Sequence, residues 1–258
     1  MSETRTWDGN SYDRVSGPME ALGLEVLSRL ELSGDETVLD AGCGSGRITE
    51  ALIERLPNGH VIGADASQSM VDAARRRLPR ADIRRIDLLE LELDEPVQVI
   101  LSTATFHWIS DHERLFTRLH SALAPGGRLL AQCGGRGNID VLRGQANTVL
   151  AREPYVEHFR DFKAPWNYAG PEETQQRLLD AGFIDARCWL QPAPKQPEEP
   201  REFLSSIVLG PHIQHLGEEL GDRFMDELLS ELGEPVIVDY VRLNIEARKG
   251  PKHSSYAH

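Results

Sequence analysis

The segment 38–47, which reads VLDAGCGSGR, constrains the fold more than any other part of the chain. The apolar run over residues 37–39 is too short for a helix and leads directly into glycine-rich sequence, which indicates a buried parallel strand followed by a turn. The pattern D-x-G-x-G-x-G allows a tight backbone path and close approach of a ligand to backbone N–H groups. Taken alone, the loop can also be an ordinary tight turn that leads into the helix predicted by the apolar spacing of residues 46–56.

Strands and helices alternate along the chain after this loop. The pattern predicts further strands over 60–64, 81–86, 97–102, 128–133, 183–190 and 235–248. It predicts helices over 67–78, 112–123, 138–152, 171–181 and 199–232. Alternation at this spacing is typical of an α/β, Rossmann-like doubly wound sheet with right-handed crossovers.

Two segments fall outside the predicted sheet. Additions after the late strands of such a sheet lie at its carboxyl edge, where ligands bind, so we expect these segments to form a helical cap. The expected division of the chain is an N-terminal helical lid over 1–35, a core over 36–135, a cap insertion over 136–170, core again over 171–197, a helical cap insertion over 198–234, a final core strand over 235–250 and a flexible tail over 251–258.

The charge balance excludes some partners. The formal net charge is −13 on 258 residues, which argues against binding to nucleic acid or to an anionic membrane surface. No apolar run approaches the ~20 residues of a membrane span, and the N-terminal sequence lacks a signal-peptide pattern, so we expect a cytoplasmic protein. The expected oligomeric state is a monomer or a homodimer. The cysteines Cys43, Cys133 and Cys188 are widely spaced, so we expect neither a disulfide framework nor a bound metal.

Two acidic residues follow the next two predicted strands. Asp65 ends the second strand, where a carboxylate can accept both hydroxyls of a ribose, or can be a charge favoured by a helix N-terminus. Asp87 follows the third strand, where it can bind an adenine edge or lie in a solvated loop. The dinucleotide fingerprint G-x-G-x-x-G needs glycine where Arg47 stands, which disfavours the alternative of a nicotinamide dehydrogenase.

With LAPGGRLL over 123–130, these motifs resemble those of class I S-adenosylmethionine-dependent methyltransferases. The resemblance covers about 36–134 and implies a seven-stranded sheet whose last strand is antiparallel, with S-adenosylmethionine as cofactor. It also implies a role for each matching position: Gly42 and Gly44 at the methionine portion, Asp40 near its amino group, Asp65 at the ribose, Ala66 and Met70 around the adenine, Asp87 and Leu88 at the adenine edge, and the backbone at Ser102 beside the ammonium group.

The sequence after the fourth predicted strand bears on the substrate. Residues 101–111, LSTATFHWISD, resemble the small-molecule carboxyl methyltransferases related to trans-aconitate methyltransferase, and Trp7 and Tyr12 resemble the N-terminal lid of that group. Thr103 and Gln98 depart from its pattern. The resemblance implies methyl transfer to a carboxylate oxygen of a small molecule, with Tyr12, His107 and Trp108 at the substrate.

The alternatives are methylation of a hydroxyl, amine or carbon of a natural product, and a non-catalytic nucleoside-binding module. A carboxylate is already ionised and needs no base, whereas a hydroxyl or amine benefits from one, for which His107 is the nearest candidate. Trp108 can donate its indole N–H to a carboxylate. The charge of a carboxylate can be neutralised by Arg242, or by Arg136, Arg201 or His212.

Overall fold

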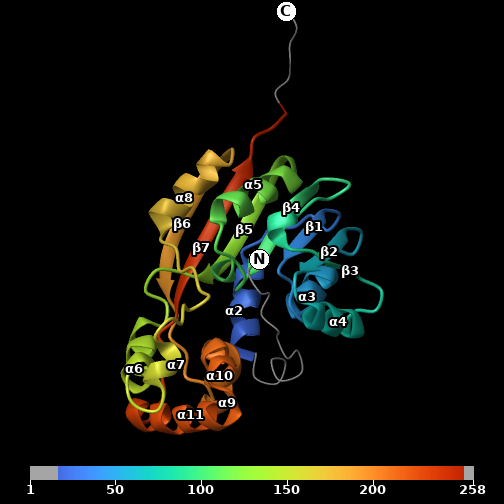
Figure 1. The fold of residues 1–258 in the computed structure, drawn as a ribbon. Coiled ribbons are helices and arrows are strands. Elements are labelled where there is room, and N and C mark those ends of the chain that lie inside the picture. Colours follow the sequence, from blue (N-terminus) through green and yellow to red (C-terminus); the bar gives the residue numbers. More distant parts are fainter. Residues whose placement is uncertain (1–16, 253–258) are drawn as a thin grey trace, which may run out of the picture.

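The computed structural model describes residues 17–252, which contain a seven-stranded mixed sheet (Figure 1). The strand order is β3-β2-β1-β4-β5-β7-β6. The strands are β1 (Thr37–Ala41), β2 (His60–Asp65), β3 (Asp82–Arg85), β4 (Val97–Thr103), β5 (Leu123–Gly134), β6 (Phe183–Pro192) and β7 (Val241–Lys249). Strands β1 to β5 pair in parallel, and β7 is antiparallel to both of its neighbours. The predicted doubly wound fold with an antiparallel last strand is therefore confirmed.

Helices cover both faces of the sheet. They are α2 (Gly17–Ser28), α3 (Arg47–Arg55), α4 (Gln68–Arg77), α5 (His112–Ala122) and α8 (Pro171–Asp180). Successive residues of a strand face opposite sides, so Val38 packs with α2 and α3 whereas Leu39 packs with α5 and α8. Strand β1 is thus buried on both faces, which is why it reads as an uninterrupted apolar run.

Two segments that are far apart in sequence pack together beyond the carboxyl ends of the parallel strands (Figure 1). We call residues 139–159 and 203–240 the cap. It contains α6 (Asp140–Leu150), α7 (Val156–Phe159), the end of α9 (Pro200–Phe203), the π-helical turn η3 (Leu204–Val208), α10 (Gly210–Leu216) and α11 (Glu218–Leu232). Tyr155, Phe203 and Phe224 are fully buried in a hydrophobic cluster of the cap, separate from the clusters against the sheet.

The late part of the chain differs from the sequence prediction in two ways. The final strand, expected over 235–250, begins only at Val241, because Val236, Val238 and Tyr240 are buried against the cap helices. The helical segment expected over 199–232 is interrupted, since a proline stands at the start of α10 and Gly217 has a left-handed φ of 77°. An alternating apolar pattern does not distinguish a strand in the sheet from a segment that lies along helices.

Several properties of the described residues bear on partners. Among residues 17–252, every helix is too short or too polar to cross a membrane. Within the same range, no three His, Cys, Asp or Glu side chains are grouped so as to hold a metal ion. Cys43, Cys133 and Cys188 are free thiols.

Candidate functional site

The glycine-rich loop joins β1 to α3 at the carboxyl edge of the sheet. Gly42 and Gly44 have φ angles of 84° and 53°, a region that favours glycine. A side chain at Gly42 would lie 2.2 Å from the hydroxyl of Thr105, which follows β4. No atom of residues 17–252 lies within 4 Å of a Cβ built at Gly44. The loop is therefore held against the end of β4 at Gly42, and at Gly44 it is uncovered by the described part of the chain.

Asp65, at the end of β2, is tied to this loop by backbone hydrogen bonds. The N–H of Gly44 donates to its Oδ2 at 3.0 Å, and the N–H of Ser67 donates to its Oδ1 at 2.8 Å. Burial raises the pKa of the Asp65 carboxyl, and the two N–H donors oppose that rise. Each carboxylate oxygen retains a second lone pair, so the group can still accept hydrogen bonds from a diol.

Asp40, on β1, is an almost fully buried carboxyl group with 1% exposure. Its Oδ2 accepts a hydrogen bond of 2.7 Å from the hydroxyl of Thr49, whereas its Oδ1 has no hydrogen-bond partner among the described residues. Burial raises the pKa of Asp40 to about 7, and the nearby charge of Asp65 adds to that rise. A cationic amine placed at Oδ1 would supply the missing hydrogen bond and favour the ionised form.

The residues expected around an adenine lie beside β2 and β3. Met70 of α4 is 4% exposed, as is Leu88, which begins the 3₁₀ turn η1 (Leu88–Glu90). The exposed Asp87 side chain caps this turn, since its Oδ1 accepts a 2.9 Å hydrogen bond from the N–H of Leu89. The carbonyl of Ala66 accepts a hydrogen bond from Arg85 at 3.3 Å. Asp87 thus has a structural role that the sequence interpretation did not include.

The chain leaves β4 with an unusual backbone conformation. Ala104 has a φ of 56°, although it is not glycine, and its N–H donates to the carbonyl of Gln132 at 2.7 Å. The hydroxyl of Thr105 lies 3.2 Å from the carbonyl oxygen of Gly42. Ser102, expected at an ammonium group through its backbone, donates its hydroxyl to the carbonyl of Ala41 at 2.6 Å. Strained non-glycine backbone is often found at functional sites, and here it connects the glycine-rich loop to the pocket described next.

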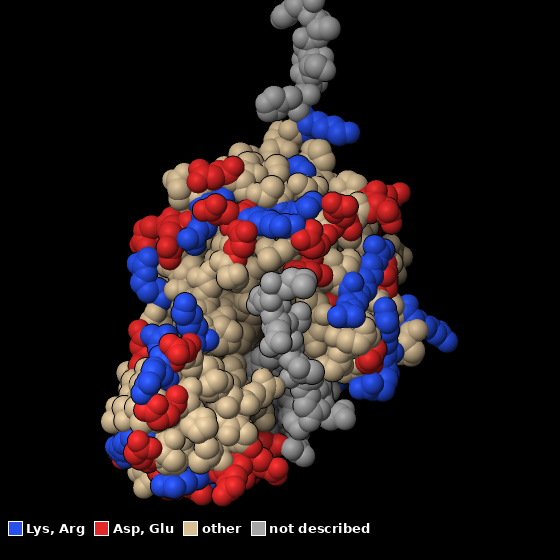
Figure 2. All heavy atoms as spheres, in the orientation of Figure 1, with Lys and Arg blue, Asp and Glu red and all other residues tan. Residues whose placement is uncertain are grey.

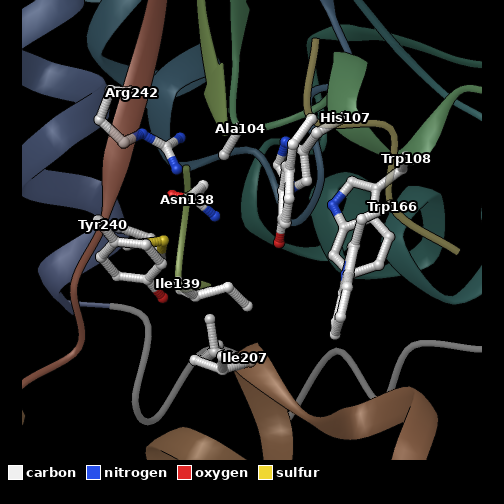
Figure 3. Close-up of a pocket in the computed structure, with 12 residues that line it drawn as sticks. Ala104, His107, Trp108, Asn138, Ile139, Trp166, Ile207, Tyr240 and Arg242 are labelled. Atoms are coloured by element: carbon white, nitrogen blue, oxygen red, sulfur yellow. The ribbon is translucent and has the colours of Figure 1, made fainter. Parts of the chain in front are cut away.

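A pocket lies between the carboxyl edge of the sheet and the cap (Figure 3). The sheet side contributes residues that follow β4 and β5, together with Arg242 near the start of β7. The opposite side is formed by the cap and by the segment before α8. The lining residues are Met19, Ala104, His107, Trp108, Asn138, Ile139, Trp166, Tyr168, Ile207, Val208, Tyr240 and Arg242.

His107 is a buried ring of the 3₁₀ turn η2 (Phe106–Trp108). The backbone N–H of Gly134, the last residue of β5, donates a 3.2 Å hydrogen bond to its Nδ1. A ring nitrogen that accepts a hydrogen bond carries no proton, so the neutral imidazole carries its proton on Nε2. His107 therefore offers a hydrogen-bond donor, and its basic nitrogen is engaged by the backbone.

Arg242 brings a positive charge into the pocket from β7. The side chain is 2% exposed, and its guanidinium group lies 5.7 Å from the ring centroid of Tyr240. Figure 3 shows the guanidinium pointing between Ala104 and Asn138. A planar guanidinium can bind both oxygens of a carboxylate at once.

Aromatic rings that the sequence interpretation missed form one wall of the pocket. Trp166 and Tyr168 are stacked, with centroids 5.8 Å apart, and Trp108 lies 6.3 Å from Trp166. Asn167, between them in sequence, donates its N–H to the carbonyl of His107 at 2.8 Å. The only signal in the sequence is the concentration of aromatic residues in PWNYAG.

The other basic candidates lie away from the pocket. Arg136 is exposed and forms ion pairs with Glu172 and Glu173, each at 3.6 Å. Arg201 forms ion pairs with two aspartates of α11 on the surface of the cap. The idea that these two arginines neutralise a substrate charge in the pocket is wrong.

His212 and the N-terminal candidates complete the predicted set. His212 is buried in the cap, where burial lowers its pKa to about 4, so it is uncharged at neutral pH and cannot neutralise an anion. Trp7 and Tyr12 lie outside the residues that the structure describes.

Figure 2 shows how charged side chains are distributed over one face of the molecule. In the view of Figure 2, acidic and basic side chains are interspersed over much of the surface, and basic side chains gather at the right, over α3 and α4. Arg114 of α5 contacts Glu90, and Arg118 contacts Glu92 at 3.1 Å. The positive charges of these two arginines are therefore offset by neighbouring carboxylates.

Residues 38–127 match a protein family model described as a methyltransferase domain. Over 127 residues, the chain is 35% identical to a trans-aconitate 2-methyltransferase of Azoarcus sp. (strain BH72). It is 38% identical, also over 127 residues, to a protein of the same name from Variovorax paradoxus (strain S110). These matches cover 49% of this chain and 50% and 49% of the two relatives, so the chain spans about half the length of the curated relatives it matches.

Solved structures extend the likeness to nearly the whole chain. A phosphoethanolamine N-methyltransferase 2 of Haemonchus contortus, in complex with phosphomonomethylethanolamine and S-adenosylhomocysteine, superposes with a TM-score of 0.62 at 20% identity. The superposition covers 95% of this chain and 57% of that chain. At this identity the likeness is one of fold. Together, the family match and the relatives confirm the resemblance expected from the sequence.

Proposed function

We propose that this chain, whose residues 38–127 match a methyltransferase domain model, is a class I S-adenosylmethionine-dependent methyltransferase that methylates a carboxylate oxygen of a small acid. The observation that carries the proposal is the buried guanidinium of Arg242 in a pocket that Ala104 also lines, next to Thr105, which contacts Gly42 of the glycine-rich loop. Relatives named trans-aconitate 2-methyltransferase support the same acceptor class.

The residues at the carboxyl edge fit the proposed cofactor. The buried Oδ1 of Asp40 needs a donor, which an ammonium group provides. The open space at Gly44 admits a ligand close to the backbone, and Asp65 is positioned by two N–H groups to accept ribose hydroxyls. When bound, S-adenosylmethionine supplies a sulfonium methyl group that is already activated for in-line displacement.

The polar groups of the pocket favour a carboxylate over a hydroxyl or an amine. Arg242 and the protonated Nε2 of His107 are donors. A hydroxyl or amine acceptor benefits from a base, and the one basic nitrogen of neutral His107 already accepts from Gly134. We therefore assign His107 the role of holding the substrate, rather than that of a general base.

The contribution of this chain to the reaction is then positioning. Arg242 and His107 would hold the carboxylate near Ala104, at the end of β4, with the attacking oxygen ~3–3.5 Å from the methyl carbon. The aromatic wall and the cap would exclude water, which strengthens the electrostatic interactions in the pocket. Because the acceptor is already ionised, no proton has to move.

The test is incubation of the whole chain with S-adenosylmethionine and a panel of small acids, alcohols and amines, including trans-aconitate, with S-adenosylhomocysteine as the readout. We expect turnover with at least one acid and a product that mild base hydrolyses, as it does a methyl ester. A base-stable product from an amine or alcohol would instead support the alternative acceptor class. Cofactor binding without turnover on any acceptor would support a non-catalytic binding module.

A further inference from the structure

The pocket has few charges for the amount of apolar surface that lines it. Among the lining residues that the structure describes, Arg242 alone carries a fixed charge. The apolar and aromatic members of the set are Met19, Ala104, Trp108, Ile139, Trp166, Ile207, Val208 and Tyr240. A second carboxylate placed against the aliphatic members Ile139, Ile207 and Val208 would lose its hydration there without gaining a donor from their side chains, which is strongly unfavourable.

The polar groups near Arg242 are suited to one anion. Asn138 accepts a 3.0 Å hydrogen bond from the N–H of Val241 through its Oδ1, and its side chain also bonds the hydroxyl of Tyr168. Burial raises the pKa of Tyr168, so this hydroxyl keeps its proton and can donate it. Asn138, Tyr168, His107 and Arg242 all line the pocket, so their polar groups are available to the same ligand.

The two ends of the pocket differ in chemistry, as Figure 3 shows. Arg242 and Ala104 lie at the end near the sheet, where Thr105 contacts the carbonyl of Gly42. Ile139 and Ile207 lie at the other end, on the cap. A carboxylate bound by Arg242 therefore lies at the cofactor end, and the rest of the acid extends toward the aliphatic side chains of the cap.

From this arrangement we infer that the substrate is a monocarboxylic acid with an apolar body, and that acids with a second carboxylate at the far end are poor substrates. The inference rests on the proposed function, and it narrows the methyl acceptor from small acids in general to monocarboxylic acids. Arg242 selects the carboxylate, and the cap residues Ile139, Ile207 and Val208 select against a second charge.

The experiment compares acids of equal length in pairs: octanoate with suberate, and hexanoate with adipate. We expect kcat/KM for the monocarboxylate of at least one pair to exceed that of its dicarboxylate by about tenfold or more. Equal or higher kcat/KM for the dicarboxylates would overturn the inference while leaving carboxyl methylation intact.

A measurement of binding without turnover tests this inference independently of the proposed function. Calorimetry in the presence of S-adenosylhomocysteine measures the affinity for the same pairs without any turnover. Tighter binding of octanoate than of suberate supports the inference even if no acid is methylated, an outcome that would remove the proposed function. Failure of every monocarboxylate to bind would overturn the inference.

A variant can reverse the selectivity. Ile207→Lys introduces a cation at the cap end of the pocket, so we expect the suberate-to-octanoate ratio of kcat/KM to rise by about tenfold. Ile237→Lys is the matched control, because Ile237 is a cap residue that is 44% exposed and does not line the pocket. A folded Ile207→Lys variant whose ratio equals that of Ile237→Lys would count against the inference. If Ile207→Lys does not fold, the wild-type pairs still decide.

Discussion

The backbone N–H of Gly134 donates to Nδ1 of His107 at 3.2 Å, which fixes the orientation of a ring that lines the pocket. Gly134 ends β5, next to β4, and His107 lies in the turn that follows β4. Because the donor belongs to a sheet strand, the position of the imidazole depends on the core of the protein and not only on a surface loop. The arrangement places the proton of the neutral ring on Nε2 and argues against proton abstraction by Nδ1.

The role of His107 can be tested by substitution with glutamine and with phenylalanine. His107→Gln keeps an N–H donor near the position of Nε2, so we expect kcat/KM for an acid to fall by less than about tenfold. His107→Phe removes the donor, so we expect a loss of about ten- to a hundredfold. The pH profile of kcat/KM should keep its shape in His107→Gln. Loss of a basic ionisation in that variant, with a fall of about a thousandfold, would indicate a general base.

Asp65 is expected to contribute directly to cofactor affinity. Replacement by alanine removes the acceptor of the N–H groups of Gly44 and Ser67 as well as the proposed ribose contact. We expect Asp65→Ala to weaken binding of S-adenosylhomocysteine by about 1–3 kcal/mol in calorimetry. Asp72→Ala is the control, because Asp72 is exposed on α4 and accepts a hydrogen bond from Gln68 of the same helix, and it should leave the affinity unchanged. Unchanged affinity in a folded Asp65→Ala variant would contradict the assignment.

Much of the cofactor side of the site could be predicted because its signals are local in sequence. The glycine-rich loop and Asp65 each follow directly on a short apolar strand. The alternation of strands and helices predicts a parallel sheet. Because the carboxyl ends of parallel strands meet at one edge of the sheet, the same alternation predicts that the loop and Asp65 lie close together. The hydrogen bond between Gly44 and Asp65 is the result.

The substrate side could not be predicted because its residues are assembled by packing between distant segments. Asn138, Trp166 and Ile207 come from three separate parts of the chain, and each reads locally as a loop or a core residue. The exposed Arg136 and the buried Arg242 look alike in sequence, and only the three-dimensional arrangement distinguishes an ion pair on the surface from a cation in the pocket. Charge alone therefore gave more candidates than the pocket contains.

The two glycines of the loop should respond differently to alanine. Gly44→Ala places a side chain in open space at a left-handed φ of 53°, a cost of about 1 kcal/mol in unfolding free energy. Gly42→Ala adds a clash with Thr105, whose nearest side-chain atom would lie 2.2 Å from the new Cβ, so we expect a cost of about 3 kcal/mol or more. Urea unfolding of both variants measures the difference. Equal destabilisation would mean that Thr105 moves away freely.

Asp40 should make the stability of the cofactor-free protein depend on pH. Burial raises its pKa from 3.8 to about 7, so between these values the folded state keeps a proton that the unfolded state has lost. The free energy of unfolding therefore falls as the pH rises through this window, by up to about 4 kcal/mol from this group. Urea unfolding at about pH 5 and about pH 8 should show about 3 kcal/mol of that fall in the wild type and none of it in Asp40→Asn. The same pH dependence in both proteins would exclude Asp40 as its source.

Arg242 should affect the acid substrate and not the cofactor. Arg242→Gln removes the buried charge from the pocket, and we expect kcat/KM for an acid to fall by about a hundredfold or more, equivalent to about 3 kcal/mol. Arg242→Lys keeps the charge but cannot form two parallel hydrogen bonds, so its activity should lie between that of the wild type and that of Arg242→Gln. Arg201→Gln is the matched control, because Arg201 is paired with aspartates on the cap surface. Full activity of Arg242→Gln on acids, or loss of S-adenosylhomocysteine binding in step with kcat/KM, would show that the guanidinium does not hold the substrate.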